Sequence, residues 1–260
     1  MFPQYTWILL IVSALICSIG FYRFVWFMSV GYGLSVAGLG LAMIVLSIGR
    51  ADLSIIVLCL LMMVYGIRLG GFLLVRELKN AAYKKKLDAQ IKPVPLPVKI
   101  VMWAFMAVLY VIQVSPVWYR INNVGKGDAL SWIGAVIALA GILLEAVADK
   151  QKSESKKKNP NKPAMDGLYR ISRCPNYFGE IVFWTGVFVS GLNILKGIQW
   201  IIAIIGYIAI LIIMFSGAKR LETRQNKNYG SDPEYQKYVS KTPIIIPLIP
   251  LYHLVKEEKK

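Results

Sequence analysis

Long runs of apolar residues constrain this chain more than any other feature of its sequence. Hydrophobic residues make up 57% of the 260 positions and charged residues 17%, and the apolar residues fall in unbroken runs, which excludes an ordinary soluble domain. A membrane-spanning helix needs roughly 20 apolar residues, because each backbone N–H and C=O must be satisfied inside the helix. The sequence therefore predicts a single all-α domain, an integral membrane bundle of about seven transmembrane helices at 5–21, 25–47, 53–75, 98–118, 129–148, 178–195 and 198–217.

The positions of lysine and arginine predict the orientation of this bundle. Basic residues stay on the cytoplasmic side of short loops, and most of those here fall in 76–97, in 149–177 and after residue 217. The opposite side has only Arg50, Arg120, Lys126 and Lys196. We therefore expect the N-terminus outside and the C-terminus in the cytoplasm. The formal net charge of +16 follows mainly from this topology, and nucleic-acid binding is not expected, because the charge is spread over loops between membrane helices.

The first apolar run is predicted to be a retained anchor. It lacks a basic segment before it and a small-residue cleavage site, and Arg23 follows it instead of preceding it, so a secretory signal is not favoured.

The cysteine and histidine content argues against metal chemistry. Three cysteines and one histidine are present, and no cysteine pair has zinc spacing. We expect no metal ion.

Ionisable side chains inside the predicted spans are the first candidates for function. An ionisable group within a bilayer is expensive unless it is paired or faces water, so each one is a functional hypothesis. Arg68 lies in the third run, Glu145 and Asp149 close the fifth on one helical face, and Glu180 opens the sixth. An alternative stays open: Arg68 pairs with Glu145 or Glu180 to hold the bundle, and Asp149 is a solvated helix end. Trp184, one turn after Glu180, lines a cavity or packs in the core.

The segment before the sixth run combines side chains that suit a phosphorylated, aromatic ligand. Arginines form bidentate hydrogen bonds to phosphate, tyrosines stack on a ring, and a carboxylate accepts hydrogen bonds from ribose hydroxyls or an amide. Pro175 is expected to fix the chain just before the helix begins. These side chains lie in the run Asp166-Gly167-Leu168-Tyr169-Arg170-Ile171-Ser172-Arg173-Cys174-Pro175-Asn176-Tyr177-Phe178-Gly179-Glu180.

The same run resembles the signature of the steroid 5-alpha-reductase family, in particular its bacterial branch of unassigned membrane proteins. The Asn-Tyr-Phe-Gly-Glu core at 176–180 is its most specific part. Tyr65-x-x-Arg68 resembles the family's Tyr-x-x-Arg in an earlier helix, and Asp149 with Gln151 stands where the family places a cofactor-contacting Asp. The closing segment also resembles the family's, through Leu221-Glu222-Thr223-Arg224, Tyr229-Gly230, Pro233-Glu234-Tyr235, Tyr238 and Ile245-Ile246-Pro247. The match covers roughly residues 60–250.

The resemblance implies a membrane-embedded, NADPH-dependent reductase that transfers hydride to the activated C=C of a lipophilic, enone-type substrate. It implies that Tyr65 donates to the substrate carbonyl, that Arg68 orients or charges the site, and that Glu180 acts beside them. Tyr65, Glu145 and Trp184 would line the substrate cavity. The cofactor-binding residues would be Asp149, Gln151, Lys152, Tyr169, Arg170, Arg173, Asn176, Tyr177, Glu180, Glu222, Arg224 and Tyr238. No GxGxxG follows a strand, so loops and helix ends would have to hold the dinucleotide.

Two departures from the family limit what the resemblance implies. The Glu-containing motif of an early helix that meets a steroid carbonyl has no counterpart, so steroid is not the expected substrate. Cys174 stands where close relatives carry His. Two other classes stay open: a membrane S-adenosylmethionine-dependent methyltransferase of the isoprenylcysteine or phospholipid type, which shares the turn before a late helix, and a non-enzymatic lipid-binding or transport protein.

Overall fold

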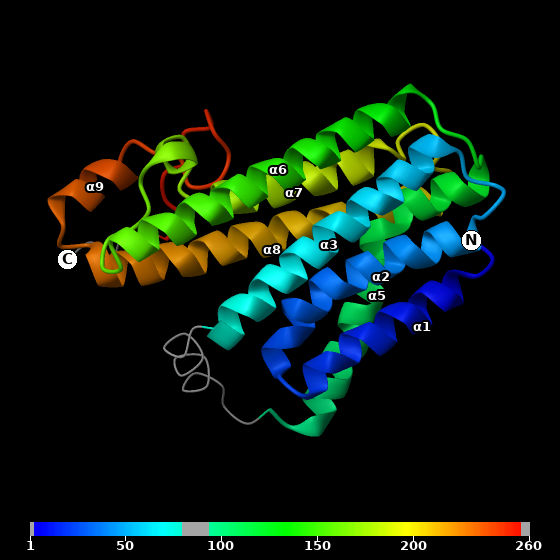
Figure 1. Cartoon of the computed structure of the whole chain (residues 1–260), viewed down its shortest axis with the longest axis horizontal. Helices are drawn as coiled ribbons and strands as arrows, with labels where there is room; N and C mark the ends of the chain where they lie inside the picture. Colours follow the sequence, from blue (N-terminus) through cyan, green and yellow to red (C-terminus); the bar gives the residue numbers. More distant parts are fainter. Residues whose placement is uncertain (1–2, 80–93, 256–260) are drawn as a thin grey trace. The chain divides into compact units, whose positions relative to one another are not determined.

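The computed structural model of this protein describes residues 3–79 and 94–255, and the chain is helical through most of this part (Figure 1). No β-strand occurs among these residues, which confirms the all-α prediction. The α-helices are α1 Thr6–Cys17, α2 Val30–Leu46, α3 Leu53–Lys79, α5 Leu96–Asn123, α6 Ala129–Lys158, α7 Pro175–Val189, α8 Ile198–Tyr229 and α9 Pro233–Val239. Three short 3₁₀ segments lie between them, at Ser18–Phe21, Phe24–Met28 and Gly167–Arg170.

Four of these helices, α3, α5, α6 and α8, are long and apolar enough to cross a membrane. Two shorter apolar helices lie at Thr6–Phe21 and Val30–Leu46. The predicted sixth span overlaps α7, which has 15 residues and is therefore about 22 Å long at 1.5 Å per residue. This is less than the roughly 30 Å of a hydrocarbon core. The protein therefore has the helices of a membrane protein, and the helix at the predicted sixth span is shorter than a full crossing.

Two helices extend well beyond the apolar runs that predict them. Helix α6 continues from the predicted end at 148 to Lys158, and α8 continues from 217 to Tyr229. Both extensions are rich in Lys, Glu, Gln and Arg, which favour helix even where they are solvated. α6 ends before the dipeptide Asn159-Pro160, whose first residue is disfavoured in the α conformation. The segment after 148, expected as a loop, is thus helical over its first third.

The chain forms two compact units, and each is described by itself. The first contains Met1–Ala135 with Val187–Tyr207, and the second contains Val136–Gly186 with Ile208–Lys260. In the first unit, α2 packs along α3 at glycine contacts. A Cβ added to Gly66 would lie 2.2 Å from the Gly33 carbonyl oxygen, and one added to Gly33 would lie 2.6 Å from the Gly70 nitrogen. Only glycine permits two helix backbones to approach this closely.

In the second unit, α6 and α7 also cross at glycines. A Cβ added to Gly141 would lie 2.3 Å from the Phe183 nitrogen, and one added to Gly179 would lie 2.7 Å from the Glu145 nitrogen. Glu145 and Glu180 are therefore held at one level of this helix pair, because Glu180 directly follows Gly179.

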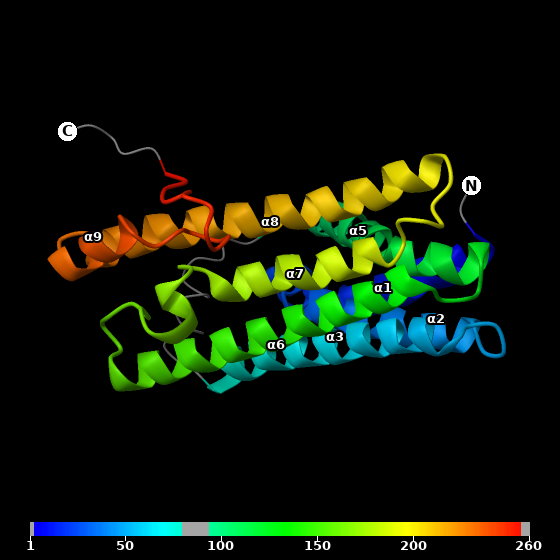
Figure 2. The same cartoon turned by 90° about the horizontal axis from the view of Figure 1, so that it is seen from above.

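The C-terminal part of the second unit packs against α8. Asp232 caps the short helix α9 by accepting from the backbone N–H of Glu234 at 2.9 Å, and Pro233 occupies its first position. Figure 2 shows the chain after α9 running back beside α8. An apolar cluster joins these segments, formed by Cys174, Ile181, Met214, Ala218, Leu221, Ile244 and Ile245, with Leu254 packed against it.

Candidate functional site

The start of α7 is held by the chain that follows α9. The Arg173 N–H donates to the Pro243 carbonyl at 2.9 Å, and the Ser172 hydroxyl donates to the Ile245 carbonyl at 2.6 Å. The Ser172 hydroxyl also accepts from the Cys174 N–H at 3.2 Å. Pro175 is the first residue of the helix, whereas the sequence analysis placed it just before the helix. Burial raises the pKa of the Cys174 thiol to about 11, so this residue is a packed thiol and not an ionised one.

Three carboxylates on α6 and α7 of the second unit are buried. Glu145 and Asp149 lie on α6, and Glu180 lies on α7. The alternative that Asp149 is a solvated helix end is wrong, because α6 continues past it and its side chain is buried. Its charge also acts on Tyr169: burial first, and Asp149 second, raise the pKa of that phenol. Carboxylates at such positions are typical of functional sites.

The first turn of α7 presents an amide and an aromatic ring beside α8. The Asn176 Oδ1 atom is buried without a hydrogen-bond partner in the described part of the chain. The Tyr177 ring lies on Gly217 of α8, since a Cβ added to Gly217 would be 3.3 Å from its Cε2. Arg220 and Arg224 follow Gly217 by three and seven residues on α8, so they share its helical face, and both are exposed. Arg220 was not predicted as a site residue, although its spacing of four residues from Arg224 puts both on one helical face.

Two of the predicted cofactor residues hold the loop between α6 and α7 instead. The Gln151 Oε1 atom accepts from the Leu168 N–H at 2.8 Å. Gly167, which has φ of 63°, lies against the same amide, where a Cβ would be 2.5 Å from Oε1. The carbonyl of Tyr169 accepts from the Tyr238 hydroxyl at 2.7 Å. The polar atoms of Gln151 and Tyr238 are thus used to fold the chain.

Arg173 and Glu222 form a buried ion pair. The Arg173 Nη2 atom lies 3.0 Å from the Glu222 Oε1 atom, and the two residues are 3% and 1% exposed. Arg173 Nη2 also donates to the Tyr252 carbonyl. The Nε and Nη1 atoms of Arg173 are buried and have no acceptor among the described residues. The structure brings these two predicted cofactor residues together, although 49 positions separate them in the sequence.

Three further predicted residues, Arg170, Lys152 and Trp184, also belong to the second unit. Arg170 is exposed and pairs with Asp166 at 3.1 Å, an exposed contact that contributes little to stability. Lys152 is half-buried on α6. Trp184 is buried on α7, where its ring packs edge-on against Phe183 with centroids 5.1 Å apart.

Tyr65 and Arg68 belong to the first unit. Tyr65 is fully buried on α3, and its hydroxyl lies 3.0 Å from the hydroxyl of Tyr32 on α2. The Tyr32 hydroxyl is a functional candidate that sequence reasoning missed. The only signal for it is the dipeptide Tyr32-Gly33, which matches Tyr65-Gly66 on the partner helix. Arg68 is half-buried one turn further along α3.

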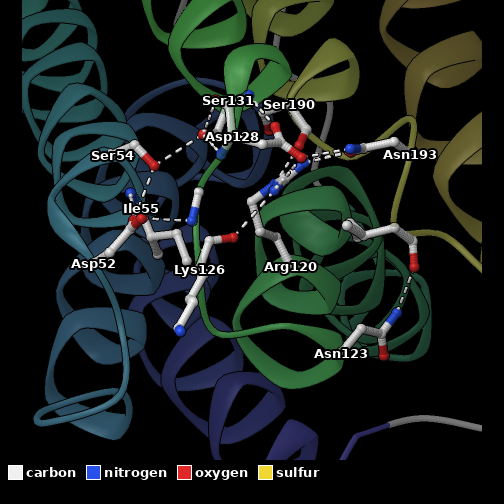
Figure 3. Close-up of polar contacts among 12 residues, drawn as sticks. Asp52, Ser54, Ile55, Arg120, Asn123, Lys126, Asp128, Ser131, Ser190 and Asn193 are labelled. Carbon is white, nitrogen blue, oxygen red and sulfur yellow. Dashed lines mark hydrogen bonds and ion pairs between the residues drawn. The ribbon is translucent and has the colours of Figure 1, made fainter.

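Figure 3 shows a polar cluster centred on Arg120 that the sequence did not predict. Arg120 follows the predicted fourth span by two residues, but α5 continues past it to Asn123, and Arg120 is 0% exposed. Its Nε donates to the Ser190 carbonyl at 2.5 Å, its Nη1 to the Lys126 carbonyl at 3.2 Å, and its Nη2 to Asn193 Oδ1 at 2.6 Å. The Asp128 Oδ2 atom lies 3.2 Å from Arg120 Nη1 and forms an ion pair with it.

The same cluster caps two helices. Asp52 caps α3 by accepting from Ser54 and Ile55, and its Oδ2 accepts from the Gly127 N–H at 2.5 Å (Figure 3). Asp128 caps α6 by accepting from the Ser131 N–H at 3.0 Å, and the Ser131 hydroxyl accepts from the Asp128 N–H at 2.8 Å. Because the hydrogen-bonding groups of Arg120 are satisfied by the chain itself, this cluster fits a structural role.

The residues of the second unit fit a dinucleotide in part. The buried Asn176 Oδ1 atom lacks a donor, which a carboxamide NH₂ would supply, and the exposed Arg220 and Arg224 suit phosphate groups. Gln151 and Tyr238 already bond within the chain. The best-supported positions for such a ligand are therefore Asn176, Tyr177, Glu180 and Arg224.

Comparison with known proteins gives one family. The family model described as "Protein of unknown function (DUF1295)" matches residues 16–242, which is most of the chain. No curated protein matches the sequence. No solved structure matches it either.

Proposed function

We propose, from the premise that this chain belongs to the DUF1295 family, that it is a membrane-embedded NADPH-dependent reductase. Its substrate would be a lipophilic compound with a C=C bond conjugated to a carbonyl. The observation that carries this proposal is the first turn of α7. There the buried, donor-less Asn176 Oδ1 and the buried Glu180 stand beside Tyr177, and two exposed arginines share the α8 face on which the Tyr177 ring rests. Together with the Asn-Tyr-Phe-Gly-Glu run, this favours a steroid 5-alpha-reductase-like cofactor site.

The side chains of this turn would bind and orient the cofactor. Asn176 would accept from a carboxamide, Glu180 would accept from a ribose hydroxyl, and Arg224 would donate to phosphate. NADPH supplies the hydride when it is bound. Charge develops on the substrate carbonyl oxygen as the C=C bond is reduced, so a donor is needed there, and the resemblance assigns this role to Tyr65. The complete burial of Tyr65 supports a hydroxyl shielded from water.

Ligand binding in detergent tests the cofactor part of this proposal. A ligand that binds only the folded protein stabilises it by about 2.7 kcal/mol at 100 times its Kd, which for a chain of this size raises the melting temperature by roughly 5–10 °C. We expect this shift with NADPH and a smaller one with NADH, since Arg224 is available for the additional phosphate. A shift with S-adenosylmethionine and none with NADPH would favour the methyltransferase.

The matched variants Glu180→Gln and Glu234→Gln sharpen the test. Both replace a carboxylate by an amide of the same size, but Glu180 is buried on α7, whereas Glu234 is exposed and pairs with Lys162 at 3.1 Å. We expect Glu180→Gln to abolish the NADPH shift and Glu234→Gln to keep it. Equal rises in melting temperature with NADPH in both variants would show that Glu180 is not part of the cofactor site.

We also infer seven membrane crossings with the N-terminus outside and the C-terminus in the cytoplasm. Each predicted apolar run coincides with a helix, and lysine and arginine concentrate in 76–97, in 149–177 and after 217. A reporter that is fluorescent only in the cytoplasm, fused after residue 260, should fluoresce. A reporter active only outside should be active when fused before residue 1, and the reverse pattern would overturn the orientation.

A further inference from the structure

The last described residues of the chain, Tyr252–Val255, fold back onto the buried carboxylate of Glu222, and we call them the strap. The Glu222 Oε2 atom accepts from the backbone N–H groups of Leu254 at 2.8 Å and Val255 at 3.0 Å. The Oε1 atom lies 3.2 Å from His253 Nδ1. Of the groups in the described residues that bond to this carboxylate, three come from the strap and the fourth is Arg173.

The strap also uses Arg173. The Nη2 atom that bonds to Glu222 donates to the Tyr252 carbonyl as well. The strap thus presents one acceptor to the arginine and adjacent donors to the carboxylate. A ribose phosphate has the same arrangement of groups: phosphate oxygens accept from arginine, and neighbouring sugar hydroxyls donate to a carboxylate.

The attachment of the strap differs from that of the chain before it. Pro243 and Ile245 bond to the backbone and side chain at the start of α7, and Ile244 is buried. The segment 243–245, which we call the base of the strap, is therefore firmly packed. Between base and strap, Leu248 is 98% exposed and adopts φ of 68°, a conformation that is unfavourable for leucine. Leu254 is the one strap residue packed against the apolar cluster of α7 and α8. Release of the strap would therefore leave the base in place.

We propose that the strap is an internal mimic of a ribose phosphate group, which occupies the Arg173–Glu222 pair and is displaced when a nucleotide binds there. The strap then acts as an autoinhibitory segment: each nucleotide bound at this pair requires one strap to leave. The assignment of the nucleotide as NADPH rests on the proposed function, whereas the competition for Arg173 and Glu222 does not. This explains how Arg173 and Glu222 can be cofactor residues although they already bond to each other and to the strap.

Amide hydrogen exchange of the full-length protein in detergent tests this directly, because the Leu254 and Val255 amides report strap release. Without ligand these amides should be protected. At a ligand concentration about ten times the Kd of the strap-released form, linkage multiplies the ratio of released to docked strap about tenfold, so their exchange should accelerate about tenfold, with both NADPH and ribose 5-phosphate as probes. The amides of α2 and α3 should not change.

Each result decides between the two proposals. If NADPH raises the melting temperature while strap exchange slows or stays constant, the strap is a lid or a fixed element and the competition is wrong, although the reductase proposal stands. If ribose 5-phosphate accelerates strap exchange but NADPH does not bind, the competition stands and the reductase proposal fails. If neither probe accelerates exchange, the mimicry is overturned.

A variant provides a second, ligand-free test. Glu222→Gln replaces one carboxylate oxygen by an NH₂ donor, which cannot accept from the strap. Losing hydrogen bonds to a buried charged group should raise exchange of the Leu254 and Val255 amides roughly 10- to 100-fold. Glu234→Gln, the exposed control on α9, should leave it unchanged. Unchanged strap exchange in Glu222→Gln would show that Glu222 does not hold the strap.

Discussion

The hydroxyl oxygens of Tyr32 and Tyr65 lie 3.0 Å apart across the contact between α2 and α3. Their rings meet edge to face, with centroids 6.3 Å apart. Each tyrosine directly precedes one of the two glycines, Gly33 and Gly66, at which the helix backbones touch. The glycines set the distance between the helices, and that distance lets two buried hydroxyls share one hydrogen bond.

Gly66→Ala should destabilise the protein. The new Cβ would lie 2.2 Å from the Gly33 carbonyl oxygen, and a backbone atom cannot move aside without separating the helices. We expect a loss of about 1–3 kcal/mol in the free energy of unfolding, typical of overpacking, measured by thermal unfolding in detergent. Gly71→Ala is the matched control on the same helix, because its Cβ would meet nothing within 4 Å. A loss in Gly71→Ala as large as in Gly66→Ala would contradict the packing argument.

Tyr65→Phe should slow reduction more than Tyr32→Phe does. On the proposed function Tyr65 is the hydrogen-bond donor to the substrate carbonyl, and removing such a donor reduces kcat by roughly 10²- to 10³-fold. On this proposal Tyr32 bonds to the donor and not to the substrate, so Tyr32→Phe should have a smaller effect on kcat and little effect on KM. The measurement is NADPH oxidation with an enone lipid that the wild type reduces. Full activity of Tyr65→Phe would exclude Tyr65 as the donor.

Arg120→Met should destabilise the protein strongly. It removes the partner of Asp128 and Asn193 and leaves the Ser190 and Lys126 carbonyls without their donor. Only the Arg120 end of this ion pair is buried, but each buried acceptor that loses its donor costs about 1–3 kcal/mol, which thermal unfolding in detergent will detect. Lys126→Met is the control, since it removes one positive charge from an exposed side chain nearby and should change stability by less than about 0.5 kcal/mol.

Stability should fall in acid because of Asp52 and Asp128. Burial opposes ionisation of both, but hydrogen bonds outweigh it: those from Gly127 and neighbouring groups lower the pKa of Asp52, and those from Asn193 and Ser131, with the charge of Arg120, lower the pKa of Asp128. A group whose pKa is lowered on folding stabilises the folded state above its unfolded pKa, about 3.9. That contribution is lost as the pH falls through the lower, folded value.

Melting temperatures between pH 3 and pH 7 will test this dependence. The wild type should lose stability below about pH 4. The double variant Asp52→Asn, Asp128→Asn should be less stable at neutral pH and should show a flatter profile. An equally steep profile in the variant would assign the acid sensitivity to other carboxylates.

Local pattern predicted the helices well and their ends less well. Each apolar run coincides with a helix, because a run of apolar residues long enough to cross a bilayer has helix as its main stable conformation. The polar ends of α6 and α8 were missed, since hydropathy does not register helix formed by lysine, glutamate and glutamine. Helix α7 begins at Pro175, three residues before the predicted span, because proline suits the first position of a helix.

The sequence by itself determined the membrane character, the all-α class and the identity of the polar residues around α7. These follow from composition and from spacing along one helix, which are local properties of the chain. Only the tertiary structure decided which distant groups meet: Tyr32 with Tyr65, Arg120 with Asp128 and Asn193, and Arg173 with Glu222 and the strap. Such pairs depend on where two helix backbones approach each other, and no local periodicity of the sequence contains that information.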